Sequence, residues 1–171
     1  MKYQLTKTQY MMDFWVYPVF GVLLGILASR QPWGGLLGLL AAGIFSWSFV
    51  EYALHRWLFH GVSSTTHDHQ QHHAKPADYI GLSGGYTLLI FIALTVCLWL
   101  LMGDHSFALA LGFMLGYYLY ISLHYCFHHR RVEPGSWLYA LKVRHVRHHV
   151  GGHENFGVTS PLWDKAFRTF R

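Results

Sequence analysis

Four apolar stretches dominate this chain of 171 residues and constrain its fold more than any other feature. Crossing the hydrocarbon core of a bilayer as a helix takes about 20 predominantly apolar residues. Residues 14–30, 35–54, 83–102 and 106–127 meet this requirement. A backbone inside lipid must satisfy its hydrogen bonds internally, which an α-helix does. The sequence therefore predicts an all-α integral membrane protein with four transmembrane helices.

The composition agrees with a location in lipid. Charged residues make up 12% of the chain, whereas soluble domains average about 25%. The length indicates one domain, residues 1–171. The net charge of +5 comes without a nucleic-acid-binding motif or a basic soluble face, so we expect no nucleic-acid partner. Cys97 and Cys126 lie within apolar stretches, and we interpret both as small core residues.

The connections between the stretches predict the topology. Those between the first and second and between the third and fourth are very short, so each pair should form a hairpin. The N-terminus, residues 55–82 and residues 128–171 then share one side of the membrane. Of 13 Lys and Arg, 12 lie on that side and only Arg30 on the other. Positive residues mark the cytoplasmic side. We therefore expect both termini and a His-rich helical cap, 55–82 and 128–171, to be cytoplasmic, in a bacterial inner membrane or the endoplasmic reticulum.

Thirteen of the fourteen histidines fall on the predicted cytoplasmic side, in segments far apart along the chain. The pattern HxxHH occurs at residues 69–73 and again at 145–149. A helix turns by about 100° per residue, so the three rings of each pattern share one face. His55 and His60 are i and i+5, which would separate their rings by about 140° on a regular helix. These two either flank a shared centre or lie where the helix end unwinds.

Ten histidines have the spacing of metal ligands, among them the i, i+4 pair His124 and His128. The ten are His55, His60, His69, His72, His73, His124, His128, His145, His148 and His149. Ten ligands exceed the four that a structural zinc ion takes. Two metal ions with about five nitrogens each would leave an open octahedral position on each ion, which suits iron and O2, although zinc can occupy such a cage. The sequence therefore predicts two iron ions, with O2 as co-substrate.

The remaining histidines have plainer interpretations. We interpret His105 as an anchor at the membrane interface, and His129 and His153 as surface groups or as hydrogen-bond partners around the metal ligands, and we leave the role of His67 open. For the ten histidines together, the alternative is a protonatable or zinc-buffering surface. His tracts of that kind form one disordered run, whereas four separate segments contribute here.

A metal-bound imidazole needs a hydrogen-bond partner for its other nitrogen, usually a carboxylate or a carbonyl. Glu51 lies one turn before His55 inside an apolar stretch, where an unpaired charge is expensive. It is our first candidate for such a partner. Further candidates are Asp78, Glu154, Asn155 and Asp164, each of which has an ordinary surface role as its alternative.

Five segments of the chain together resemble the fatty acid hydroxylase superfamily. They are EYALHRWLFH, HQQHHAKPADY, YISLHYCFHH, VRHVRHH and NFGVTSPLWDKAFRTF, and they follow the family's order over residues 50–171. The family consists of integral-membrane di-iron enzymes and includes fatty acid 2-hydroxylases and sterol desaturase relatives. The ordered set of His motifs with the closing GVTS-x-x-WD pattern is far more specific than one HxxHH.

The resemblance implies that the same ten histidines bind two irons and that the protein hydroxylates a lipid with O2. The family's 2-hydroxylases act at the carbon next to the acyl carbonyl. The resemblance also implies an electron carrier such as cytochrome b5 or a ferredoxin. We expect this carrier to be a separate protein, because no cytochrome b5 domain precedes the membrane part of the sequence.

Two other functions remain open at this point. The small size and the His motifs are also similar to those of carotenoid ring hydroxylases, so a carotenoid or sterol hydroxylase or a desaturase of the same di-iron class is the main alternative. A non-catalytic metal-binding protein or transporter is a more remote one. A transporter should carry polar ligands near the middle of its spans, and these spans have almost none.

Residues outside the His motifs carry weaker expectations. Trp15, Trp33, Trp47 and Trp99 could line a slot for a lipid tail, although aromatic residues in spans mostly pack or mark the interface. Gly112 and Gly116 form a GxxxG pattern, which favours close helix packing. Lys142, Arg144 and Arg147 could dock an acidic electron carrier or a lipid headgroup, or could serve topology alone.

Overall fold

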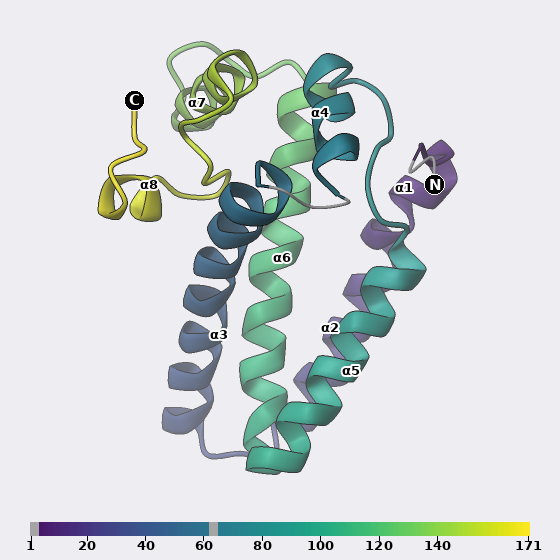
Figure 1. The fold of residues 1–171 in the computed structure, drawn as a ribbon. Helices are drawn as coiled ribbons and strands as arrows, with labels where there is room; N and C mark the ends of the chain where they lie inside the picture. Colours follow the sequence, from purple (N-terminus) through teal and green to yellow (C-terminus); the bar gives the residue numbers. More distant parts are fainter. Residues whose placement is uncertain (1–3, 62–64) are drawn as a thin grey trace. The chain divides into compact units, whose positions relative to one another are not determined.

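The computed structural model describes residues 4–61 and 65–171, and every regular element in these ranges is a helix (Figure 1). The elements are α1 (Lys7–Met11), α2 (Asp13–Ala28), α3 (Trp33–Ala53), the π-helix η1 (Leu54–Phe59), α4 (Thr66–Ala74), α5 (Gly84–Met102), α6 (His105–His129), α7 (Trp137–Gly151) and α8 (Leu162–Ala166). The all-α prediction is confirmed.

Four helical stretches are long and apolar enough to cross a membrane: Lys7–Ala28, Trp33–Phe59, Gly84–Met102 and His105–His129. All four predicted spans are therefore helical, with ends that differ by a few residues. The first begins earlier because a capping box at Thr6 starts α1. The second continues beyond the predicted end because α3 runs directly into η1.

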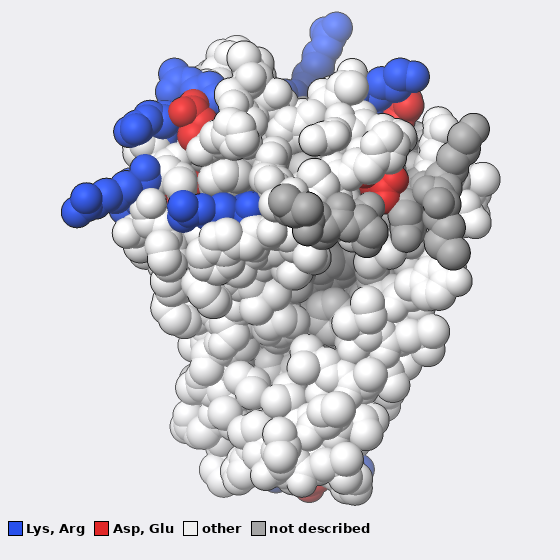
Figure 2. All heavy atoms as spheres, in the orientation of Figure 1, with Lys and Arg blue, Asp and Glu red and all other residues white. Residues whose placement is uncertain are grey.

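The chain divides into two compact units. The first comprises residues 4–47 and 81–118, and the second comprises 48–61, 65–80 and 119–171. In the described ranges, the first unit holds two basic residues, Lys7 and Arg30, whereas the second unit holds ten Lys and Arg residues. Figure 2 shows Lys and Arg side chains in blue and a broad white surface that carries neither basic nor acidic side chains.

In the first unit, α3 and α6 approach each other closely through glycines. A Cβ added at Gly43 would lie 2.6 Å from the Phe113 nitrogen, and one added at Gly112 would lie 2.9 Å from the Leu40 Cα. A Cβ at Gly116 would meet the side chain of Trp47 at 2.6 Å. The GxxxG pattern therefore serves helix packing, as small residues commonly do between membrane helices.

The four tryptophans of the spans differ in burial. Trp47 is buried and its ring centroid lies 5.1 Å from that of Tyr117. Trp15, Trp33 and Trp99 are exposed on the first unit. Exposed aromatic rings on an apolar helical surface are typical of residues that contact lipid or its interface.

A polar cluster that the sequence analysis did not identify lies inside the first unit. Asp13, the first residue of α2, is buried and accepts hydrogen bonds from Thr87 Oγ1 at 3.0 Å and from Tyr117 Oη at 2.7 Å. Thr87 belongs to α5 and Tyr117 to α6. Because an unpaired charge within a span is expensive, these two bonds are what make the buried carboxyl group tolerable.

The second unit has a small apolar core built from α6, α7 and the segment that precedes α8. Leu123, Phe127 and Val158 are buried together, with Leu138 and Leu141 of α7 packed against them. This core fixes α7 beside the end of α6 and holds the chain after α7 in place. Those elements carry many of the histidines singled out by the sequence.

Candidate metal centre

The first pair of histidines owes its geometry to the π-helical turn η1. The His60 N–H donates to the His55 carbonyl at 3.2 Å, an i+5 to i hydrogen bond. This wider turn brings the two rings to the same side of the helix, with centroids 5.3 Å apart. Both sequence-based alternatives therefore hold: the two rings share one centre, and they do so where the end of the helix widens into a π-helical turn. π-Helical turns are rare in proteins, and many of those that occur lie at functional sites.

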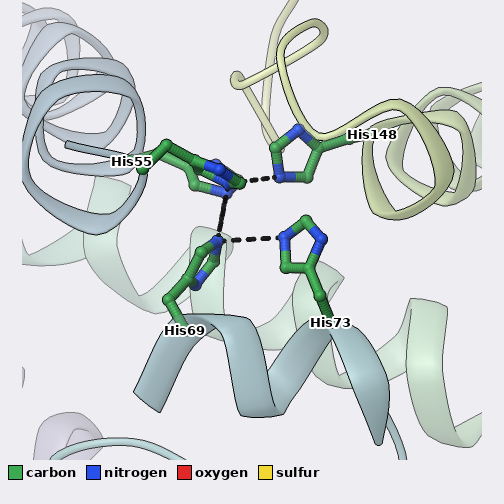
Figure 3. Close-up of side chains that lie close together, drawn as sticks. His55, His69, His73 and His148 are labelled. Carbon is green, nitrogen blue, oxygen red and sulfur yellow. Dashed lines mark hydrogen bonds between the residues drawn. The ribbon is translucent and has the colours of Figure 1, made fainter. Parts of the chain in front are cut away.

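All ten predicted ligands come together in the second unit, as two groups of five. The first cluster is His55, His60, His69, His73 and His148. The second cluster is His72, His124, His128, His145 and His149. In each cluster one ligand atom from every residue lies within 4.8 Å of the others. Figure 3 shows four rings of the first cluster, from η1, α4 and α7, pointing toward one another.

Each HxxHH pattern is divided between the two clusters. On α4, His69 and His73 belong to the first cluster and His72 to the second. On α7 the division is reversed. His148 belongs to the first cluster, whereas His145 and His149 belong to the second. The rings of His73 and His149 stack at 4.2 Å between centroids, one from each cluster. The two clusters are therefore adjacent and share two helices.

The ring nitrogens in each cluster lie within hydrogen-bond distance of one another. In the first cluster, Nε2 of His69 lies 3.0 Å from Nε2 of His55 and 2.9 Å from Nε2 of His60. In the second, Nε2 of His145 lies 2.8 Å from Nε2 of His128. His72 Nε2 is buried without a hydrogen-bond partner among the described residues. A cation between the rings would satisfy all of these atoms.

The protonation of the rings agrees with a metal site. His55 Nδ1 donates to the Phe156 carbonyl at 2.5 Å, and His148 Nδ1 donates to the Glu154 carbonyl at 2.7 Å. A neutral imidazole carries one N–H, so Nε2 of both residues presents a lone pair to the first cluster. Neutral imidazole is the form that binds metal ions. The residues present therefore fit a metal ion in each cluster.

Burial keeps the rings neutral at physiological pH. Loss of solvation, reinforced by neighbouring histidines, lowers the pKa of His60 to about 4 and the pKa of His72 and His149 to about 3. It also lowers the pKa of His148 to about 3, and the hydrogen bond to the Glu154 carbonyl opposes this shift only in part. Desolvation disfavours the charged form of histidine. Protons therefore compete weakly for these nitrogens near pH 7.

The carbonyls that accept from His55 and His148 belong to one segment, residues 154–159, which we call the carbonyl segment. Its backbone is held by two carboxylates. Asp164 accepts from Phe156 N at 2.8 Å and from Gly157 N at 2.9 Å. Glu51 accepts from Val158 N at 2.5 Å and from Thr159 N at 3.0 Å. These two acids therefore support the segment, and through it the first cluster.

Glu51 thus lies where the sequence analysis expected, one turn before His55, but its carboxylate bonds the carbonyl segment and not an imidazole. Glu154 contributes its main-chain carbonyl to His148. Asn155 is fully buried, and its Oδ1 accepts from Arg171 N at 3.0 Å. Asp78 follows α4, and within residues 4–61 and 65–171 its carboxylate has no hydrogen-bond partner.

Arg144 also contacts the carbonyl segment. It is 8% exposed, and its Nη2 donates to the carbonyls of Gly157 at 2.7 Å and Val158 at 3.1 Å. Of the two roles left open for it, docking of a carrier or headgroup does not fit, because its guanidinium faces inward. Lys142 and Arg147 lie on the outer side of α7, beside a groove of about 440 Å³.

The other four histidines lie outside both clusters. His67 contacts Gln71, its neighbour one turn along α4. His129 stacks between two tyrosine rings, Tyr79 and Tyr125. His153 is exposed. His105, in the first unit, contacts Gln31 at 3.0 Å.

Sequence reasoning missed the role of the Glu154 and Phe156 carbonyls. A backbone acceptor has no signature of its own in a sequence. The available signal was the NFGVTSPLWD motif, which contains one of these carbonyls and the acid that supports it. The packing of Phe59 on His69 and of Tyr120 on His124, both with nearly parallel rings, was also not foreseen.

Residues 40–169 match the sequence family described as fatty acid hydroxylase. The chain is 36% identical over 151 residues to a fatty acid 2-hydroxylase of Macaca fascicularis, covering 77% of this chain and 39% of that protein. It is 33% identical over 186 residues to the ceramide very long chain fatty acid hydroxylase scs7 of Schizosaccharomyces pombe, covering 96% of this chain and 52% of the relative. The chain thus spans about half, or less, of the length of these relatives.

The fold is also similar to that of a solved structure. The structure titled full length scs7p, in which only the hydroxylase domain is visible, matches with a TM-score of 0.80 and 23% sequence identity. The match covers 97% of this chain and 68% of that chain. At this level of identity the similarity establishes the fold.

Proposed function

Because the chain belongs to the fatty acid hydroxylase family, we propose that it is an O2-dependent di-iron hydroxylase that acts on a fatty acyl chain of a membrane lipid. The observation that carries this proposal is the pair of five-histidine clusters. We further propose the carbon next to the acyl carbonyl as the position oxidised. Relatives named fatty acid 2-hydroxylase and dihydroceramide fatty acyl 2-hydroxylase support that position.

The ten clustered histidines are the proposed iron ligands, five for each ion. Five neutral nitrogens leave one octahedral position free for O2 or substrate, whereas structural zinc sites are closed with four ligands. Iron bound there would supply the activation of O2 that breaks an acyl C–H bond, chemistry that belongs to the cofactor. Zinc could replace iron in purified protein without changing the fold.

The protein's own contribution is orientation and exclusion of water. The Glu154 and Phe156 carbonyls hold the N–H tautomers of His148 and His55, so that Nε2 of each ring faces the first cluster. His145 and His148 are almost fully buried, so water reaches these positions poorly. The burial of these rings favours a neutral, metal-bound ring over a protonated one.

The four apolar helices support a substrate that resides in the bilayer. We place the clusters, both termini and the His-rich segments on the cytoplasmic side, because the described part of the second unit holds ten Lys and Arg. The family match runs through both units, which supports one functional domain. Insertion of one oxygen atom from O2 also consumes two electrons and two protons, which a separate cytochrome b5 or ferredoxin type of carrier would supply.

Lipid analysis of cells that express the protein tests the proposal. Membrane lipids should gain acyl chains with one added oxygen, placed next to the carbonyl by fragmentation in mass spectrometry. His72→Ala and His148→Ala, one from each cluster, should abolish this gain and lower the bound metal, while the exposed His153→Ala should leave both unchanged. Loss of two hydrogens from the acyl chain would instead indicate a desaturase. Oxygenated carotenoids or sterols would indicate the alternative substrates.

A further inference from the structure

The two clusters have unequal hydrogen-bond support. In the first, His55 and His148 each donate Nδ1–H to a carbonyl of the carbonyl segment, at 2.5 and 2.7 Å. In the second, His145 is just as buried, at 2% exposure, yet its Nδ1 has no partner among residues 4–61 and 65–171. Partners of this kind orient the ring and raise the basicity of the nitrogen that binds metal. The support is therefore concentrated on one cluster.

A single peptide group connects His55 to a buried acid. The Phe156–Gly157 peptide accepts from His55 Nδ1 through its carbonyl and donates to Asp164 Oδ2 at 2.9 Å through its N–H. Asp164 is fully buried. Hydrogen bonds in such a chain polarise one another in a medium of low dielectric. The negative charge of Asp164 thus makes the Phe156 carbonyl a stronger acceptor for His55.

Asp164 also reaches the carbonyl that supports His148. Its Oδ1 accepts from Thr169 Oγ1 at 2.8 Å, and the Thr169 carbonyl accepts from Asn155 N at 2.9 Å. The Asn155 N–H belongs to the same peptide group as the Glu154 carbonyl, which accepts from His148. Both supported histidines of the first cluster are therefore linked to one carboxylate.

Glu51 holds the other end of the carbonyl segment, at Val158 and Thr159. It accepts from Val158 N, Thr159 N and Thr159 Oγ1. Arg144 lies between the two acids and donates to the Gly157 and Val158 carbonyls. Four successive N–H groups thus point to carboxylates, and the backbone of the segment has little freedom to turn its carbonyls away from the first cluster.

From these contacts we infer that the two clusters bind their metal ions with different affinity, the first more tightly, and that Asp164 and Glu51 are positioning residues for the first cluster alone. This inference rests on the proposed role of the ten histidines as metal ligands. Loss of such partners typically lowers metal affinity by about 10–100-fold. Asp164→Asn should therefore weaken one of the two binding steps and leave the other unchanged.

Titration of the metal-free full chain in detergent with Co²⁺, followed by visible absorption and elemental analysis, tests the inference. The wild type should bind in two steps. His60→Ala should remove the tighter step and His128→Ala the weaker one, which assigns each step to a cluster. Asp164→Asn should weaken the tighter step by about 10–100-fold. Glu51→Gln should weaken it less, because Glu51 accepts from Val158 N and Thr159 N, and neither belongs to the peptide groups whose carbonyls accept from His55 and His148. The exposed Glu133→Gln is the matched control and should change neither step.

The step that does not change shows that a variant is folded. Equal weakening of both steps in Asp164→Asn and Glu51→Gln would overturn the inference, since it would indicate a general effect on folding. Assignment of the tighter step to the second cluster would overturn it too. A wild type that binds no Co²⁺ would contradict the proposed function itself, whereas two identical, independent steps would contradict only the inequality inferred here.

Discussion

Replacing Gly112 by alanine tests the close approach of α3 and α6 in the first unit. A Cβ at this position would lie 2.9 Å from the C and Cα atoms of Leu40 and closer still to its carbonyl oxygen. Carbon atoms in contact are about 3.5–4.0 Å apart, so the helices would have to separate by roughly 1 Å. Backbone atoms cannot rotate aside as the end of a side chain can.

The expected loss of stability is up to about 2 kcal/mol. Overpacking of a close contact costs about 1–3 kcal/mol, and alanine recovers up to about 1 kcal/mol of helix propensity over glycine. Gly38, also on α3, is the matched control, because an added Cβ there has nothing within 4 Å. Gly38→Ala should therefore gain the propensity alone and stabilise the protein by up to about 1 kcal/mol.

The assay is unfolding of the purified protein in mixed micelles with increasing dodecyl sulfate, followed by circular dichroism. The two alanine variants should shift the free energy of unfolding in opposite directions. A Gly112→Ala variant as stable as Gly38→Ala would refute the backbone-to-backbone packing, and with it the interpretation of the GxxxG pattern given above.

Asp13→Ala should destabilise the protein by about 1–3 kcal/mol in the same assay, because it removes the buried carboxylate that accepts from Tyr117 Oη and Thr87 Oγ1, although Thr87 keeps its bond to the Gly84 carbonyl; an unchanged midpoint would show that the cluster contributes nothing. In metal-free protein, stability should fall as the pH is lowered from about 6.5 towards 3, as measured by thermal unfolding. The reason is that the unfolded chain binds protons below the ordinary histidine pKa of about 6.5, while burial holds the pKa of His60 at about 4 and that of His72 at about 3 in the folded chain. A stability that rises over this range would contradict the buried, neutral state of the rings.

The spans and the identity of the clustered histidines were predictable because both depend on local patterns. Apolar length alone locates the four helices, and residue spacing locates the ligand candidates. The division of each HxxHH pattern has a simple geometric basis in retrospect. On α4, His69 and His73 are about 40° apart around the helix and share a cluster, whereas His72 lies about 60° to the other side.

The support of the clusters was not predictable, because it depends on contacts between distant segments. Glu51 was expected to bond an imidazole, but Val158 and Thr159, more than a hundred residues later in the chain, occupy its oxygens. The π-helical turn that brings His55 and His60 together also has no distinct sequence pattern. Arg144 looked like a docking residue from its place among basic neighbours, and only the folded chain shows its side chain turned inward.

Elemental analysis of the full chain, purified without oxygen from iron-supplemented cells, tests the central claim most directly. The account predicts two iron ions per chain in the wild type and about one in His60→Ala or in His128→Ala, since each substitution removes a ligand from a different cluster. Hydroxylated lipids from cells whose purified protein holds no metal, or an iron content unchanged in both variants, would contradict it.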